Sequence, residues 1–222
     1  MQVSRYLKGI ETRNLILLEA KKVFYQKGYN KATITEICNN IDIKGGTFTY
    51  YFEKKTDIAH EIYSELLMKC YDFVERTESS PLNSIQKNVR SVFLYHLALF
   101  RDQNTIAFHY EILQKESAGD YIGSHVDQIY RDFDEELKLG LTEKEISDAA
   151  SADAGARREL TLRLFREKNF QLSSMDVLEF AATINTIMGR IFTMKEETIK
   201  EAICEAREFV KNNDYSELRL LI

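Results

Sequence analysis

The stretch IKGGTFTYYFEKK, Ile43–Lys55, departs from the pattern of the rest of the chain. It gathers two adjacent glycines, two threonines, two tyrosines and three lysines in thirteen residues, between segments whose apolar positions recur with a helical period. Two glycines beside a lysine are compatible with a phosphate-binding loop, with a plain turn, or with the start of a helix that meets a flat, negatively charged surface. The flanking segments discriminate between these possibilities.

Two helices are predicted before this stretch and one after it. Thr12 is a good N-cap for a first helix that Gly28 ends, and Thr33 with Glu36 has the capping-box spacing of a second, short helix. The stretch itself supplies about two helical turns, and a long helix follows from about Asp57. Two short helices joined by about three residues behind a longer one form a helix-turn-helix.

The remainder of the chain is predicted to be a helical bundle. Its next helix starts with Ser80 as the cap and Pro81 at the first helical position. Residues 142–156 are rich in small side chains and indicate a short helix and a connector. The other helices are expected at about 104–117, 121–139, 157–168, 174–194 and 196–213. One proline in 222 residues and the absence of Asn-Gly or Asp-Gly agree with an all-α fold.

Charge is distributed unevenly along the chain, although the net charge is −5. Residues 1–60 hold ten Lys or Arg and six Asp or Glu, a balance of +4, whereas the remainder has a balance of −9. A basic head on an acidic body indicates a polyanionic partner for the head alone. No stretch approaches the ~18 apolar residues of a membrane span, and nothing resembles a signal peptide. We therefore expect a cytoplasmic protein with no membrane partner.

The motifs of common catalytic and metal sites are missing. Gly45-Gly46 is followed by Thr-Phe-Thr and not by the spacing of a phosphate-binding loop, and no strand precedes it. No Glu-x-x-His pair and no G-x-S-x-G elbow occurs. The three cysteines lie far apart, as in a reduced protein. We expect no enzyme, no catalytic residues, no metal and no cofactor.

Double-stranded DNA is the partner that suits the opening stretch. Glycines at a helix start leave backbone N–H groups uncovered where a phosphate can approach, and hydroxyl and ammonium groups flank them. The alternative is a structural turn with solvated lysines. The predicted DNA-binding residues are Thr33, Lys44, Gly45, Gly46, Thr47, Thr49, Tyr50, Tyr51 and Lys55.

Residues 12 to about 62 resemble the DNA-binding domain of the TetR (tetracycline-repressor-like) family of transcriptional regulators. The matching positions, in register and without a gap, are Thr12-Arg13, Ile16-Leu17, Ala20, Phe24, Gly28-Tyr29, Thr33, Ile37, Ile43, Gly46-Thr47-Phe48, Phe52, Lys55 and Ile58. The chain departs from the family at Lys44, which replaces a capping serine, and at Gly45 and Thr49. Operator preference cannot therefore be transferred from a relative.

The resemblance implies a helix-turn-helix DNA-binding domain over residues 1–55 and a helical effector-binding and dimerisation domain over residues 56–222. It implies a homodimeric repressor, released from a palindromic operator by an unknown small-molecule effector. The expected dimer contacts are Ile184, Ile187, Met188, Gly189, Ile191, Ile203 and Phe209, although both final helices could instead close the monomer's own core. The expected ligand contacts are His96, Phe100, His109, Tyr110 and Phe133, although aromatic residues at helical spacing also serve as plain core.

Three alternatives remain open at this stage. One is a helix-turn-helix dimer without a small-molecule effector, acting as an architectural or partner-gated DNA binder. Another is a helical adaptor whose basic head binds an acidic protein, and the third is an enzyme with a site assembled from distant residues. The salt dependence of DNA binding separates the first from the second.

Overall fold

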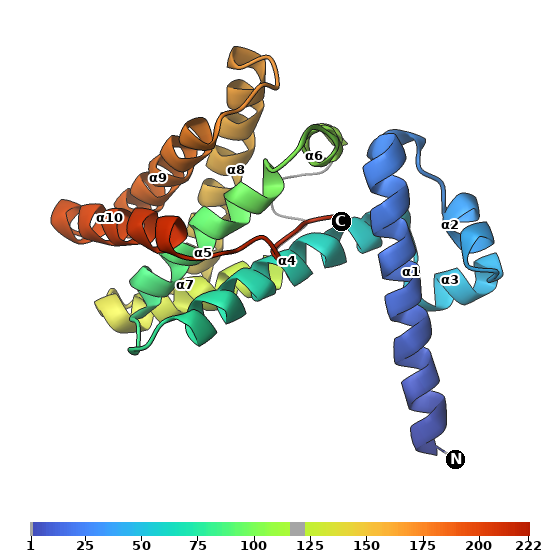
Figure 1. Cartoon of the computed structure of the whole chain (residues 1–222). Coiled ribbons are helices and arrows are strands. Elements are labelled where there is room, and N and C mark those ends of the chain that lie inside the picture. The colour runs from blue at the N-terminus through green and yellow to red at the C-terminus, as the bar shows by residue number, and fades with distance from the viewer. Residues whose placement is uncertain (1, 116–122) are drawn as a thin grey trace.

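The chain forms a helical head joined to a larger helical bundle (Figure 1). This computed structural model describes residues 2–115 and 123–222. Within those ranges the chain forms ten helices and no strand, which confirms the all-α prediction. Their bounds are α1 Gln2–Lys31, α2 Ile34–Asn40, α3 Gly45–Tyr51, α4 Lys55–Thr77, α5 Ser84–Leu99, α6 Gln103–Lys115, α7 Gly123–Leu137, α8 Glu143–Glu167, α9 Ser174–Ile191 and α10 Glu196–Asn212. No helix in these ranges combines the length and apolar character of a membrane span.

The head consists of α1, α2, α3 and the first turns of α4. Figure 1 shows α2 and α3 along one flank of α1, and the chain contacts agree with that placement. Its core residues are fully buried: Ile16, Ala20 and Phe24 of α1, Ile37 of α2, Phe48 of α3 and Ile58 of α4. Helices of seven residues are too short to be stable alone, so α2 and α3 depend on this packing.

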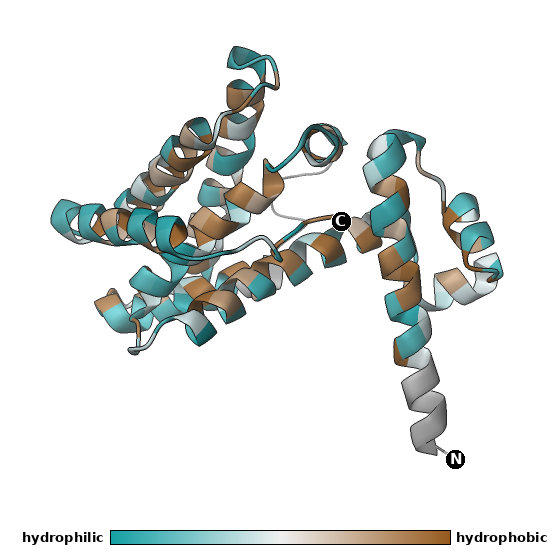
Figure 2. Ribbon diagram, in the orientation of Figure 1, coloured by the Kyte–Doolittle hydropathy of each residue, from teal (hydrophilic) through white to brown (hydrophobic). Residues whose placement is uncertain are grey.

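The bundle is organised around α5, in which twelve of sixteen residues are buried. A helix that is buried on nearly all sides belongs in the middle of a bundle, and α5 contacts α4, α7, α9 and α10. α4 joins this bundle to the head, and Figure 2 shows its ribbon alternating between hydrophobic and hydrophilic residues, as a one-sided apolar stripe requires. Since α4 packs in both parts, a domain boundary at residue 55 stays a prediction.

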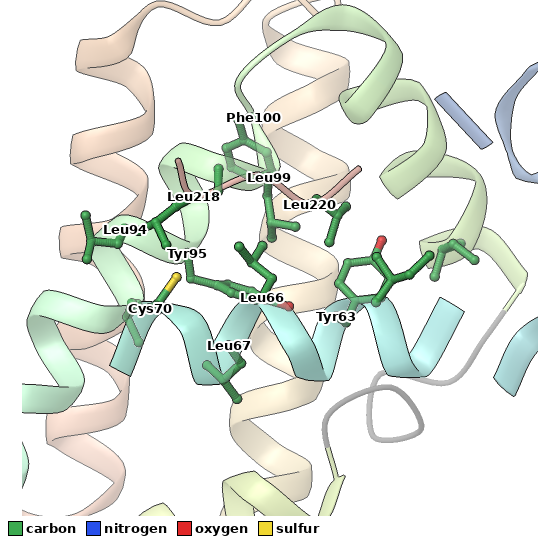
Figure 3. Close-up of a cluster of buried hydrophobic side chains, with 14 of the residues drawn as sticks. Tyr63, Leu66, Leu67, Cys70, Leu94, Tyr95, Leu99, Phe100, Leu218 and Leu220 are labelled. Carbon is green, nitrogen blue, oxygen red and sulfur yellow. The ribbon is translucent and has the colours of Figure 1, made fainter. Parts of the chain in front are cut away.

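A C-terminal tail folds back over the bundle after α10. Leu218, Leu220 and Leu221 are buried, and Figure 3 shows Leu218 and Leu220 on the same side of α4 as Leu66 and Leu99. The sequence predicted no structure beyond residue 213, because three leucines without a helical or strand period give no periodic signal.

Two predicted helix starts were wrong. α1 begins at Gln2, and Thr12 lies inside it, whereas Gly28 leaves the helical conformation as predicted, with φ 75°. α5 begins after Asn83, not at Ser80 with Pro81. Asn83 Oδ1 accepts a hydrogen bond from the backbone N–H of residue 86 at 2.8 Å, and the Gln86 side chain accepts one from the backbone of Asn83 at 3.3 Å. This reciprocal cap satisfies two free N–H groups, and Ser80 has no such partner three residues later.

The connector predicted at residues 142–156 was also wrong, since α8 runs through it without a break. Thr142 starts this helix, accepting from the Glu145 backbone N–H at 3.3 Å and donating its own N–H to the Glu145 carboxylate at 2.8 Å. Alanine is the strongest helix former, so a run of small residues continues a helix as readily as it ends one.

Candidate nucleic-acid interface and ligand cavity

A tight turn orients α2 and α3 relative to each other. Thr33 caps α2 as predicted, because its Oγ1 accepts a hydrogen bond from the Glu36 N–H at 3.1 Å. The other half of the predicted capping box does not form, since the Glu36 carboxylate pairs with Lys27. Asp42 turns the chain toward α3 with φ 53°, a left-handed conformation that aspartate tolerates better than most residues.

α3 is anchored by one buried side chain and exposes the others that were predicted to meet DNA. Phe48 is fully buried and packs at 6.1 Å from Phe52, between ring centroids. Tyr50 is 81% exposed, so its ring and hydroxyl are available to an external surface. Six of the predicted DNA contacts in residues 44–50 are exposed: Lys44, Gly45, Gly46, Thr47, Thr49 and Tyr50.

The start of α3 is open to a close approach of another backbone. The first amides of a helix have no acceptor within the helix, and here these belong to Gly45 and Gly46. The N-cap Lys44 makes no side-chain cap, and no atom would lie within 4 Å of a Cβ placed on either glycine. A DNA phosphate can therefore come closer than side chains usually allow.

Two exposed lysines flank this surface in the sequence, and their ammonium groups form no ion pair with a described residue. Neither Lys44 nor Lys54 forms an ion pair with a residue of the described ranges, whereas Lys21 and Lys27 of the same head are both paired. An unpaired ammonium at a surface is free to neutralise a phosphate, which is the main source of affinity for DNA.

Lys55, also predicted to bind DNA, lies elsewhere. Its Nζ donates to the carbonyl oxygens of Tyr29 at 2.6 Å and of Ala32 at 2.8 Å, and it lies 4.3 Å from the centre of the Tyr29 ring. Burial lowers the pKa of this ammonium, and the nearby Lys115 lowers it further. Lys55 therefore ties α4 to the end of α1. Tyr51 is half-buried, with its hydroxyl near the α1 backbone at Gly9.

Sequence reasoning did not include Thr35, and it named Lys54 as a source of charge but not as a DNA contact. Thr35 is exposed in the first turn of α2, and Lys54 is exposed just before α4. The signal for Thr35 was its position two residues after the Thr33 cap, because the first turn of a helix behind the recognition helix commonly meets the DNA backbone.

A cavity of about 240 Å³ lies in the bundle among α4, α5, α7 and α8. Much of its wall is apolar, from Leu67, Val92, Val126, Ile129 and Ala150.

Polar groups converge at one side of this cavity, where the Tyr130 hydroxyl and Arg157 both bind the carboxylate of Asp153. Asp153 is 3% exposed. Burial lowers the pKa of the Arg157 guanidinium, but Asp153 and other neighbours more than offset this and raise it, so that Arg157 is charged. Burial, followed by the Asp153 charge, raises the pKa of Tyr130, which therefore stays a neutral donor.

None of the five predicted ligand residues lines this cavity. His96, Phe100 and His109 pack against one another, Tyr110 packs against Phe170, and Phe133 lies behind Tyr130. Burial lowers the pKa of both histidines to about 3, so they are neutral. His109 Nδ1 is 2.7 Å from the Tyr63 hydroxyl. These aromatic residues pack in or against the core, which was the alternative interpretation. Phe133 and Phe100 also line two other, more open pockets, so the five ligand contacts stay a prediction.

The predicted dimer residues divide into two sets. Ile184, Met188, Gly189 and Phe209 are buried inside this monomer, and a Cβ on Gly189 would lie 3.0 Å from Ile199 of α10. This glycine thus allows α9 to approach α10 within one chain. The remaining three, Ile187, Ile191 and Ile203, are partly exposed. A dimer interface on α9 and α10 stays a prediction, and only the second set has surface to contribute.

The head has known relatives. Residues 16–62 match the family described as "Bacterial regulatory proteins, tetR family". Over 55 residues the chain is 42% identical to the HTH-type transcriptional repressor BepR of Brucella suis biovar 1 (strain 1330), an alignment that spans 25% of this chain and 26% of that repressor. The head therefore carries the N-terminal domain of the TetR family. This domain is the DNA-binding part of a family of regulators, which agrees with the expectation that the chain is not an enzyme.

The whole fold resembles solved members of the TetR family. A crystal structure of full-length native TylP, a TetR regulator from Streptomyces fradiae, superposes with a TM-score of 0.53 and 16% identity, covering 95% of this chain and 94% of that one. A second TylP structure gives a TM-score of 0.52 and 16% identity, covering 92% and 94%. Identity this low establishes the fold alone. The curated repressor is matched over about a quarter of its length, so activity and partners beyond the family are matters for proposal.

Proposed function

We propose that the chain is a homodimeric transcriptional repressor that binds a near-palindromic DNA operator and is released when a small molecule enters the cavity. The observation that carries the DNA-binding part is the exposed surface of α3, where Thr47 and Tyr50 lie beside the open amides of Gly45 and Gly46. Unpaired Lys44 adds charge at the same end. Recognition helices enter the major groove with their N-terminal residues at the base edges, and this surface has the right size and chemistry.

The dimer would use α9 and α10. Met175 is 60% exposed, and with partly exposed Ile187 and Ile191 it provides apolar surface on α9. Pairing about a two-fold axis would set two α3 helices about one DNA turn apart, roughly 34–36 Å, as a palindrome requires.

The ligand-release part is supported by the position of the cavity. Leu67 of α4 lines it, and Lys55 at the start of the same helix holds the end of α1. Occupancy that shifts α4 would thus change the placement of the head. Reversing a 99:1 preference for the DNA-binding state requires about 5.5 kcal/mol of differential affinity.

Fluorescence anisotropy with duplex selected from a random library tests DNA binding. The affinity should fall steeply with salt, by a logarithmic slope of about −0.9 for each phosphate neutralised. Thr47→Ala with Tyr50→Ala should abolish selective binding while size-exclusion with light scattering still reports a dimer. Lys144→Ala is the matched control, because Lys144 has an 83% exposed side chain and lies in α8.

Three outcomes would contradict part or all of the proposal. A salt-independent affinity would favour an adaptor that binds an acidic protein. Loss of both DNA binding and dimerisation in the α3 variant would show that the two surfaces have been misplaced. If the protein binds DNA and no small molecule that enters the cavity releases it, the alternative without a small-molecule effector is favoured.

A further inference from the structure

In the Asp153–Arg157 ion pair of the cavity wall, both residues keep side-chain atoms that form no hydrogen bond with a described residue. The Tyr130 hydroxyl, at 2.6 Å, and the Arg157 Nε both donate to Oδ2 of Asp153. The other carboxylate oxygen, Oδ1, is buried and has no hydrogen-bond partner among the described residues. The two Nη atoms of Arg157 donate to no residue of the described ranges, although the side chain is only 19% exposed. A buried acceptor without a partner is costly, and here it belongs to the carboxylate that the Arg157 guanidinium binds.

The neighbouring polar side chains do not supply the missing bonds. Asn88, which also lines the cavity, has its Oδ1 occupied by the Tyr71 hydroxyl at 2.7 Å, and its Nδ2 faces the sulfur of Met188 at 3.8 Å. The wall also carries the hydroxyls of Tyr95, Ser147 and Ser151, but the buried carboxylate oxygen that lies beside a charged donor belongs to the Asp153–Arg157 pair.

The charges in the cavity wall and the volume of the cavity limit which kind of ligand can bind there. The two charges of the pair cancel, and the other charged side chain in the wall is half-buried Asp127. With Asp127 the wall carries a net charge of −1, which disfavours an anion. A cation that approached Asp153 would lie beside the Arg157 guanidinium and be repelled by it. A cavity of about 150 Å³ takes benzene, so one of about 240 Å³ holds roughly ten non-hydrogen atoms.

We propose that this cavity binds an uncharged, largely apolar molecule whose polar end carries a hydrogen-bond acceptor beside a donor, as a primary or cyclic amide does. The ligand N–H donates to Asp153 Oδ1, and its carbonyl oxygen accepts from Arg157 Nη. The apolar body lies against Leu67, Val92 and Ile129. This inference rests on the proposed function, because it names the ligand class of the same cavity.

Four small aromatic compounds of nearly identical shape test which polar group of a ligand the Asp153–Arg157 pair prefers. Benzamide has both a donor and an acceptor, benzoate has acceptors and a negative charge, benzamidine has donors and a positive charge, and acetophenone has an acceptor alone. Calorimetry or saturation-transfer NMR on the full chain, with probes up to about 10 mM, ranks them. Benzamide should bind at least about fivefold more tightly than each of the others, which is the usual value of one hydrogen bond. Tighter binding of benzoate or benzamidine, or no binding by any probe, overturns the inference.

Charge-changing variants should reorder the probes in opposite directions. Asp153→Asn leaves the Arg157 guanidinium without a counter-charge, so benzoate should become the tightest-binding probe. Arg157→Leu leaves the Asp153 carboxylate without a counter-charge, so benzamidine should become the tightest-binding probe. Arg131→Leu is the control, because it removes an ion pair with Glu143 outside the cavity wall and should keep the wild-type order. An unchanged order in folded variants would show that the pair is only structural. If a variant fails to fold, the wild-type ranking decides.

DNA binding is measured separately, so the two ideas can fail independently. A chain that binds duplex DNA with a steep salt dependence but does not prefer benzamide refutes only the ligand class. A chain that prefers benzamide but does not bind duplex DNA retains the ligand class and refutes the proposed function.

Discussion

Lys55→Ala separates two roles for one lysine, a DNA contact and a structural tie between α4 and α1. Lys55 Nζ makes two hydrogen bonds to the carbonyls of Tyr29 and Ala32 and lies over the Tyr29 ring. The carbonyls at a helix end carry partial negative charge, so a cation is well placed there. In the structural role, removal of Lys55 destabilises the free protein.

The magnitude follows from these contacts. A hydrogen bond to a charged group contributes about 1.5–3 kcal/mol and a cation–π contact about 0.5–1 kcal/mol at a partly exposed site. Because burial of the ammonium offsets part of this gain, we expect a loss of about 2–3 kcal/mol in the free energy of unfolding. For a chain of this length that lowers Tm by roughly 4–12 °C.

Urea unfolding and thermal melts in the absence of DNA give both quantities, and the neighbouring Lys54 supplies the control. Lys54 is exposed and forms no ion pair with a described residue, so Lys54→Ala should change stability by less than about 0.5 kcal/mol. It should instead reduce the salt slope of DNA binding by about 0.9. If Lys55→Ala melts like the wild type and loses only DNA affinity, Lys55 is a DNA contact and the structural argument is refuted.

Three further changes test local features of the fold by urea unfolding. Gly28→Ala should destabilise by about 1–3 kcal/mol, because φ 75° with ψ 175° is a conformation essentially restricted to glycine and the new Cβ would lie 2.9 Å from the carboxylate of Glu111. Gly155→Ala, inside α8 with no atom within 4 Å of the new Cβ, should instead stabilise by about 0.5–1 kcal/mol, and a loss there would contradict the uninterrupted helix. Burial lowers the pKa of His96 and His109 to about 3, so the unfolded state binds more protons below pH 6.5. The free energy of unfolding should therefore fall by about 2–3 kcal/mol between pH 7.5 and 5.5. His109→Gln should halve that fall, and an unchanged fall would contradict the burial of the His109 imidazole.

Local sequence signals located the helices of the head, apart from the start of α1, and most of those of the bundle. The helical period of apolar residues located α4, α9 and α10, and Thr33 gave the start of α2. These features depend on residues within one or two turns of each other, which a sequence displays directly. Competing caps were not resolved, as at Ser80 and Asn83, because each is locally reasonable and tertiary packing selects between them.

Long-range contacts account for what the sequence did not predict. Lys55 is close to the DNA-binding stretch in sequence, yet carbonyls 23 and 26 residues earlier bind its ammonium. The cavity is lined by polar residues that gave no motif, including Asp153 and Arg157 within a segment of small residues. An i, i+4 ion pair on a helix is ordinarily a surface feature, and its burial follows only from how α7 packs on α8.

The end of α1 is held from two sides, and this links the bundle to the head. Lys55 of α4 binds its last carbonyls, while Glu111 of α6 accepts from the Asn30 N–H at 2.7 Å. The Tyr63 hydroxyl of α4 meets His109 of α6 at 2.7 Å, so the two helices also hold each other. A ligand that shifts α4 relative to α6 must break one of these attachments or rotate α1 with it. Since α2 and α3 pack on α1, rotation of α1 would carry the recognition surface, and the spacing of two such surfaces in a dimer would change.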